Sequence, residues 1–181
     1  MEIKPLRLKG TFEIISRRNG DSRGYFMRTY DRRIFADLGL QPVWEQESQS
    51  FNIRRDTIRG LHFQKPPLVE TKFVSVLQGA IWDVFVDLRK DSETYGQWDS
   101  IELTAENDRA VYIPKGFAHG FRTLAENTLI AYKIDVLYQA ELAGGIRWND
   151  PSLNVNWQTQ TPIISPRDEQ LEFLENFISP F

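Results

Sequence analysis

The chain has 181 residues, no cysteine and a formal net charge of -3 at pH 7. This length predicts one domain with a full hydrophobic core, the lack of cysteine excludes disulfide scaffolds and cysteine-ligated zinc sites, and the balanced charge argues against non-specific nucleic-acid binding. No signal peptide is visible, and no apolar run approaches the ~20 residues needed to span a bilayer. We therefore expect a cytoplasmic protein that does not contact a membrane.

The predicted elements begin with a short helix over Asp31–Leu38, whose apolar side chains share one face. Further along, the Gln78-Gly79 turn predicts a hairpin between strands 73–77 and 80–88. Side chains alternate along a strand, so both faces of the second strand can be assigned. One face carries Ile81, Asp83, Phe85 and Asp87, and the other carries Trp82, Val84, Val86 and Leu88.

The second half of the chain continues as short strands. They are predicted at Trp98–Leu103, Ala110–Ile113, Gly120–Leu124 and Thr128–Asp135. A second helix is predicted over Pro166–Phe177, with Ser165 as its N-cap, in a C-terminal tail of about residues 162–181. Many short strands separated by turns favour an all-β sandwich or small barrel, here as one domain over residues 1–181.

The two histidines of the chain stand in similar surroundings, each beside glycines and near a strand edge. They occur in the segments Arg59-Gly60-Leu61-His62-Phe63-Gln64 and Pro114-Lys115-Gly116-Phe117-Ala118-His119-Gly120. A lone histidine is often only a hydrogen-bonded imidazole in the core or on the surface. Two histidines with the same local pattern favour a shared site.

This pair resembles the two motifs of the cupin β-barrel family. His119 matches the second motif, although Thr123 stands where that motif has asparagine, and Gln64 replaces the second histidine of the first motif. Metal cupins bind their ion with several histidines and a carboxylate. Because this chain has only two histidines, we expect no metal and no other cofactor.

A more specific resemblance runs in order from about Arg23 to Asp168. Its segments are Arg23–Phe26, Ile58–Gln64, Lys72, Asp83–Leu88, Pro114–Gly120, Tyr132-Lys133, Gly145–Pro151 and Ser165–Asp168. The chain resembles the dTDP-4-dehydrorhamnose 3,5-epimerase family in all of them. That resemblance implies a cupin-type double-sheet jelly roll with short helices and a small helical C-terminal tail. It also implies a homodimeric isomerase that inverts C3, C5 or both in a nucleotide-linked 4-keto-6-deoxy hexose, on the way to L-rhamnose-type sugars.

The chemistry of that reaction suits the residues at the matching positions. Protons at C3 and C5 are α to the C4 ketone, so their removal needs a base and a positive charge that stabilises the enolate. By the resemblance His62 is the base, Asp168 orients it and Tyr132 is the acid on the opposite face. Lys72 and Arg59 supply positive charge for the enolate oxygen or for the diphosphate. From the residues alone, Asp168 can also be an acid at a helix N-terminus and Tyr132 a core aromatic.

The resemblance also implies a set of substrate-binding positions, in which Tyr138 stacks on the nucleotide base. These positions are Arg23, Arg28, Gln46, Ser48, Arg59, His119, Tyr138 and Arg167. Asp83 is a weaker candidate, either supporting a neighbouring site residue or paired inside the protein with a lysine or arginine.

Three single positions and one short segment depart from the family pattern. Arg28 and Ala143 each stand where the family has glutamate, Ser48 replaces an asparagine, and Val136-Leu137-Tyr138 replaces Asp-Tyr-Tyr. The sequence therefore leaves open the nucleotide, for which dTDP is expected, and the number of centres inverted. Two other functions stay open as well: a metal-dependent cupin enzyme such as a dioxygenase, and a non-catalytic sugar-binding cupin. An early strand of one subunit is expected to add to the sheet of the other.

Overall fold

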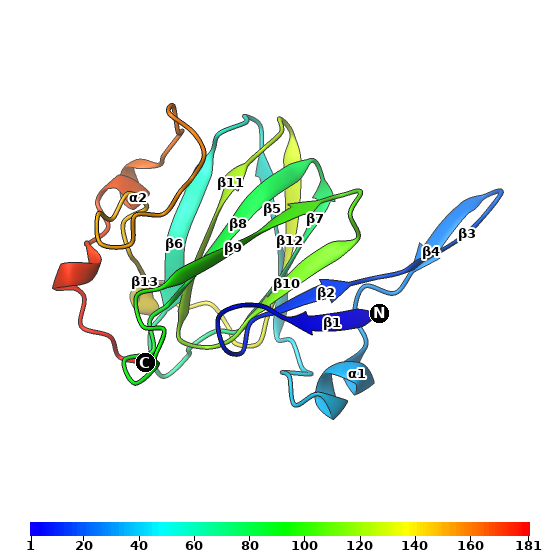
Figure 1. The fold of residues 1–181 in the computed structure, drawn as a ribbon, viewed down its shortest axis with the longest axis horizontal. Coiled ribbons are helices and arrows are strands. Elements are labelled where there is room, and N and C mark those ends of the chain that lie inside the picture. The colour runs from blue at the N-terminus through cyan, green and yellow to red at the C-terminus, as the bar shows by residue number, and fades with distance from the viewer.

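Two antiparallel β-sheets face each other in the computed structural model, which describes residues 1–181 (Figure 1). The six-stranded sheet has the order β1 (Glu2–Pro5), β2 (Phe12–Ile15), β10 (Arg109–Ile113), β7 (Lys72–Gln78), β12 (Thr128–Ile134) and β5 (Gln46–Asn52). The five-stranded sheet has the order β13 (Ala143–Gly145), β6 (Ile58–Gln64), β11 (Phe117–Thr123), β8 (Ala80–Asp87) and β9 (Trp98–Thr104). The predicted all-β double-sheet jelly roll is confirmed.

A third, two-stranded sheet lies apart from this sandwich. It consists of β3 (Arg18–Asp21) and β4 (Gly24–Met27), and Figure 1 shows it projecting away from the two main sheets. Two of its aromatic side chains are exposed, Tyr25 at 56% and Phe26 at 68%. The hairpin therefore makes little use of the main hydrophobic core.

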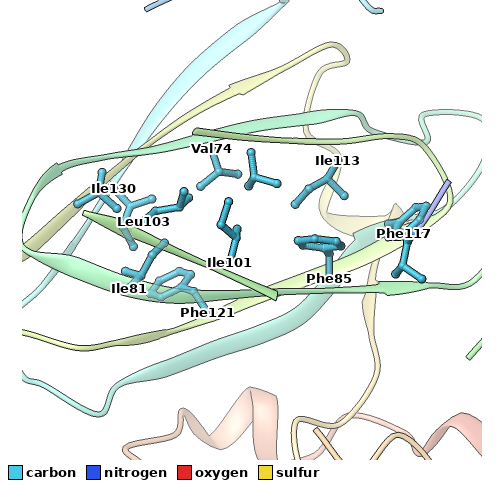
Figure 2. Packing of buried hydrophobic residues seen from close by; sticks show 12 residues of the cluster. Val74, Ile81, Phe85, Ile101, Leu103, Ile113, Phe117, Phe121 and Ile130 are labelled. Carbon is cyan, nitrogen blue, oxygen red and sulfur yellow. The ribbon is translucent and has the colours of Figure 1, made fainter. Parts of the chain in front are cut away.

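Apolar side chains from both sheets fill the space between them (Figure 2). The alternation predicted for β8 is confirmed, because Ile81 and Phe85 lie in this core while Val84 and Val86 pack on the other side of the sheet. All four side chains are fully buried. Burying a side chain of this size contributes about 1.5–3 kcal/mol, so β8 stabilises both layers that it separates.

The outer faces of the sheets are covered in two different ways. The C-terminal part of the chain covers the five-stranded sheet with Leu153, Trp157 and Phe177. Helix α1 (Arg32–Asp37) covers the six-stranded sheet, where the buried Phe35 packs edge-to-face on Phe73. Because both outer faces are covered, an internal site can lie only in the part of the space between the sheets that the apolar core does not fill.

The predicted helix over Pro166–Phe177 is wrong in its extent. Helix α2 (Pro166–Glu169) starts as predicted, with the Ser165 hydroxyl accepting from the Asp168 amide at 3.1 Å, but it ends after one turn. Its continuation bonds elsewhere: Glu172 forms a bridge with Ile146, and the Leu174 amide donates to Asp150 at 2.6 Å. These long-range partners replace the hydrogen bonds of a continuing helix.

The remaining helical elements are two short 3-10 turns, η1 (Ala140–Leu142) and η2 (Leu174–Asn176). No helix in the structure has both the length and the apolar character required to cross a membrane.

Candidate active site

A β-bulge in β6 brings two site residues to the same face of the strand. In the pairing of β6 with β11, His62 lies opposite His119 and Arg59 lies opposite Phe121, so three residue steps on β6 match two on β11. In a regular strand, residues three apart point to opposite faces. The extra residue lets both Arg59 and His62 border the same cavity.

Glycine is needed at this bulge for steric reasons. Gly60 has a φ of 130°, and a Cβ added there would lie 2.5 Å from the Cα of Gly120 on the neighbouring strand. Only a residue without a side chain fits such a close approach of two backbones. The Gly60 and Gly120 positions therefore hold the bulge in place.

The cavity between the two sheets has a volume of about 350 Å³. Eight of the predicted site residues line it: Ser48, Arg59, His62, Lys72, His119, Tyr132, Tyr138 and Arg167. Two more lie immediately behind the wall, because Asp168 bonds His62 and the Gln46 side chain accepts from the Tyr138 amide at 3.2 Å. The structure thus brings together ten of the twelve predicted residues.

The other two predicted residues lie away from the cavity. Arg23 sits between β3 and β4, in the hairpin that projects from the sandwich (Figure 1). It pairs with Asp21 at 2.6 Å, and its side chain is 88% exposed. Arg28 follows that hairpin and pairs with Asp31 at 3.1 Å. Within one chain, neither arginine borders the space that the others share.

Asp168 holds the imidazole of His62. Its Oδ1 lies 2.6 Å from His62 Nε2, and its Oδ2 accepts from the Gly60 amide at 3.2 Å. Burial alone would raise the pKa of Asp168, but the bonds from His62 and Gly60 and the charge of Arg167 outweigh it, so this pKa lies below its usual range. The carboxylate is therefore ionised at neutral pH, and Nδ1 remains as the basic nitrogen of His62. Asp168 also lies in the first turn of α2, so the residue that contacts His62 is at the same time an acid at a helix N-terminus.

A second histidine–aspartate pair lies deeper, between β11 and β8. His119 Nε2 is 2.8 Å from Asp83 Oδ2, and the two side chains are 5% and 0% exposed. Oδ1 of Asp83 is buried without a hydrogen-bond partner. Burial raises the pKa of Asp83, although the nearby charges of His119 and Lys72 act against the shift. The partner of Asp83 is thus a histidine rather than the predicted lysine or arginine.

Tyr132 borders the cavity from the sheet that faces His62. It lies on β12, and its ring meets that of His119 edge-to-face, with centroids 6.2 Å apart. The surrounding protein raises the pKa of the Tyr132 phenol well above its usual range, the negative charge of Asp83 raises it further, and Arg59 opposes both effects. The hydroxyl therefore keeps its proton at neutral pH and can donate it.

Two residues that the sequence reading missed hold the cations of the cavity. Lys72 Nζ lies 2.8 Å from Glu70 and donates to the His62 carbonyl at 3.2 Å. Arg59 Nε donates to Asn52 Oδ1 at 2.7 Å. The sequence did contain a signal for Glu70, because it stands two residues before Lys72, and side chains two apart on an extended chain point the same way. Asn52 had none, since its contact depends on how β5 and β6 meet.

Comparison with known proteins identifies the family. A family model described as dTDP-4-dehydrorhamnose 3,5-epimerase matches residues 5–176. The chain belongs to this family. The epimerase of this name from Methanothermobacter thermautotrophicus is 43% identical over 151 residues, which cover 82% of this chain and 80% of the relative.

Two further comparisons describe the range of the family. The crystal structure of the dTDP-4-dehydrorhamnose 3,5-epimerase from Bacillus anthracis with TDP and PPi bound superposes with a TM-score of 0.93, at 42% identity, over 96% of this chain and 99% of that chain. A dTDP-4-dehydrorhamnose 3-epimerase from Streptomyces niveus is 34% identical over 169 residues, 93% of this chain and 82% of the relative. The protein is therefore an isomerase of the epimerase family, and it has the fold of these enzymes.

Two of the departures from the epimerase pattern fall inside the cavity. Ser48 and Ala143 both line it, whereas Arg28 is on an exposed turn. In this epimerase the cavity thus has a short hydroxyl and a methyl group at positions that the family pattern gives to larger polar groups.

Proposed function

We propose that this chain epimerises a dTDP-linked 4-keto-6-deoxy hexose at C3, at C5 or at both, without a metal. The observation that carries the proposal is that one cavity contains His62, held by Asp168, on one sheet and a protonated Tyr132 on the other. A base and an acid from facing sheets suit a reaction that removes a proton from one side of a carbon and returns one to the other side.

The reaction starts with proton removal by His62. Nδ1 takes the proton from C3 or C5, the electron pair of that C–H bond moves into an enolate at C4, and Asp168 stabilises the imidazolium that forms. Lys72 and Arg59 supply the positive charge that the enolate oxygen requires. No electron leaves the substrate, so no redox partner is involved.

Tyr132 then completes the inversion. Its hydroxyl gives a proton to the opposite face of the enolate carbon, and the C4 ketone re-forms. Water then returns a proton to the phenolate of Tyr132 and takes up the proton held by His62. The raised pKa of the phenol supports this role, because the group keeps its proton until the enolate is present.

Hydrogen bonding of the cavity donors supports a metal-free reaction. Nε2 of His62 is bonded to Asp168 and Nε2 of His119 to Asp83. The remaining carboxylate, Glu70, is held by Lys72. These contacts leave one free nitrogen on each imidazole, and no three histidine or carboxylate side chains are grouped so that they could supply the several nitrogen and oxygen ligands that a metal ion requires.

The substrate's nucleotide half is proposed to lie at the mouth of the cavity. Arg167 supplies a cation for the diphosphate, and Tyr138, which is 58% exposed, offers a ring on which the base can stack. The names of the relatives and the TDP in the Bacillus anthracis structure favour a thymidine nucleotide.

We also propose that the protein works as a homodimer. Arg23 has a predicted role at the nucleotide but lies away from the cavity of its own chain, on a hairpin with exposed aromatic rings. The distant position of Arg23 and the exposed rings are both explained if the β3–β4 hairpin docks on a second copy and brings Arg23 to that copy's site. Light scattering at micromolar concentration should give about twice 21.1 kDa, and a monomer would contradict this arrangement.

One experiment tests the reaction itself. The protein is mixed in D2O with dTDP-4-keto-6-deoxyglucose, and deuterium is located by NMR. Label at both C3 and C5 identifies a 3,5-epimerase, and label at C3 alone identifies the single-centre activity named for the Streptomyces niveus relative. Binding without label would indicate a sugar-binding protein, and loss of activity on chelation would contradict the metal-free mechanism.

A further inference from the structure

Gln64 is a buried cavity residue for which the proposed reaction has no use. It lies on β6 two residues after His62, points into the same cavity and is 2% exposed. Both ends of its amide are engaged. Nε2 donates to the carbonyl oxygens of Leu68 at 2.7 Å and Leu137 at 3.1 Å, and Oε1 accepts from the Gln139 amide at 2.7 Å.

These partners belong to two loops that are far apart in the sequence. Leu68 lies on the loop 65–71, which leads from β6 into Lys72 at the start of β7. Leu137 and Gln139 lie on the segment 135–142, which follows β12 and carries Tyr138. One side chain therefore joins a loop next to the enolate-stabilising cation to a loop next to the predicted base-stacking ring.

The same two loops meet at further points. The Thr71 amide donates to Asp135 Oδ1 at 2.6 Å, and the Lys65 amide donates to the Leu142 carbonyl at 2.8 Å. These bonds lie near the ends of the loops, whereas Gln64 contacts their middle parts at the cavity wall. Of the side chains and backbone groups in these contacts, only Gln64 lines the cavity itself.

The chemistry of this contact requires a primary amide. Two carbonyl oxygens need two donors and one backbone amide needs an acceptor, and a single carboxamide supplies all three. A carboxylate of the same size would offer no donor and would repel both carbonyls. An apolar side chain would leave three partly buried backbone groups without this partner, which is unfavourable.

We propose that Gln64 is a positioning residue, which joins the loops 65–71 and 135–142 and so sets the spacing between Lys72 and Tyr138 on either side of the bound nucleotide sugar. Gln64 touches neither reacting carbon in this role. It acts on substrate binding through the loops, and this part of the inference rests on the proposed function. The joining of the loops is a property of the protein alone.

The test compares Gln64→Glu and Gln64→Leu with the wild-type protein, and uses Asn107→Ala as a matched control. Asn107 also makes three hydrogen bonds with both ends of its amide, but in the turn between β9 and β10. Amide hydrogen exchange is followed by mass spectrometry, and KM and kcat are measured with the nucleotide sugar. Thermal melting verifies that each variant is folded. If Gln64→Leu does not fold, Gln64→Glu still provides the test, because it keeps the size of the side chain.

Both Gln64 variants should exchange faster in the loops 65–71 and 135–142 together, with the β7–β8 hairpin unchanged. KM should rise about tenfold while kcat stays within about threefold, because the loops misplace the substrate and leave His62 in position. The KM effects of Gln64→Glu and Tyr138→Ala should be less than additive, since both act through one loop. Asn107→Ala should lower the melting temperature but should change neither the exchange of the two loops nor KM.

The inference has two separate ways to fail. Unchanged exchange, or faster exchange in only one loop, would show that Gln64 does not join them, whatever the protein catalyses. Loosened loops with an unchanged KM would show that the contact has no part in binding. If no nucleotide sugar is turned over, the proposed function fails, and the exchange experiment still decides whether the loops are joined.

Discussion

The two histidine–aspartate pairs of the cavity contain the same side chains and differ in what surrounds the carboxylate. Both aspartates are buried, and burial is the largest influence on each pKa. Asp168 has partners on both oxygens, and its pKa falls below the usual range. Asp83 has a bare oxygen, and its pKa rises. Deeper burial and a missing hydrogen-bond partner together separate Asp83, whose charge is disfavoured, from the ionised carboxylate of Asp168.

The two imidazoles also differ in their exposure to the cavity. His62 is 35% exposed and meets the cavity, whereas His119 is 5% exposed. The open pair is suited to exchanging protons with a substrate and with water. The closed pair acts on its surroundings instead, since the charge of Asp83 helps to keep Tyr132 protonated. Four predictions test this division of roles, from the largest expected effect to the smallest.

Replacing His62 with Asn should have the largest effect on activity. A general base contributes about 10²–10⁴-fold, so both turnover and deuterium incorporation from D2O should fall by that factor. His119→Asn is the matched control and should retain exchange at the carbon centres. If His119→Asn abolished exchange and His62→Asn did not, the roles of the two pairs would be reversed.

Replacing Lys72 with Met should lower epimerisation and solvent exchange together, by about 10²–10³-fold, because the enolate itself loses its stabilising charge. The substitution leaves Glu70 without its partner. The double variant with Glu70→Gln separates the two causes, and recovery of activity in it would indicate that the unpaired carboxylate, rather than the missing ammonium, was responsible.

Replacing Tyr132 with Phe should separate the two half-reactions. His62 can still remove a proton and exchange it with water, so deuterium should enter the recovered substrate while epimer formation falls about 10²-fold. The ring is kept, and so is its packing against His119. Epimer formation at the wild-type rate would exclude Tyr132 as the acid, and Tyr138 would be the next residue to test.

The smallest effects concern stability, and the two aspartates should give opposite pH dependences. The folded pKa of Asp168 lies below its unfolded value of about 3.9, so its contribution is complete above that pH and is lost as the pH falls through the folded pKa. The stability deficit of Asp168→Asn should therefore be full at pH 7 and shrink in acid. Each unit of pKa difference corresponds to about 1.36 kcal/mol.

For Asp83 the sign is reversed. Its folded pKa lies above the unfolded value, so the wild-type protein loses stability as the pH rises through the folded pKa. Asp83→Asn has no charge to disfavour, and its stability relative to the wild type should improve with rising pH. Urea unfolding between pH 3 and 8 gives the free energy of unfolding of both variants. If the two variants showed the same pH dependence relative to the wild type, the two aspartates would not differ in this way.

Local sequence signals were sufficient for much of the fold. The Gln78-Gly79 turn and the alternation in 80–88 gave the β7–β8 hairpin and both of its buried faces. The polar strand β5, Gln46–Asn52, has no such alternation to reveal it, because its side chains face the cavity and solvent. The length of the C-terminal helix was wrong because Ile146 and Asp150, distant in sequence, determine where it ends.

The candidate site depended on a different kind of information. His62 and Asp168 are 106 residues apart in the chain, and no periodicity connects them, so their pairing came only from the family resemblance. That resemblance gave no partner for Asp83 and did not reveal Glu70 or the loop contacts of Gln64. The partners of Asp83 and Gln64 depend on how strands and loops meet around the cavity, which a pattern along one strand does not describe.

The bulge in β6 ties the identity of residue 60 to the length of the strand. If β6 kept its length but paired evenly with β11, every side chain before the bulge would change face. Arg59 would then enter the apolar layer under the C-terminal segment, and Ile58 would turn toward the cavity. If Gly60 were deleted, even pairing would keep Arg59 on the face of His62, because residues two apart on a regular strand point the same way. Among related sequences, the glycine at this point should therefore be lost only together with one residue of the strand.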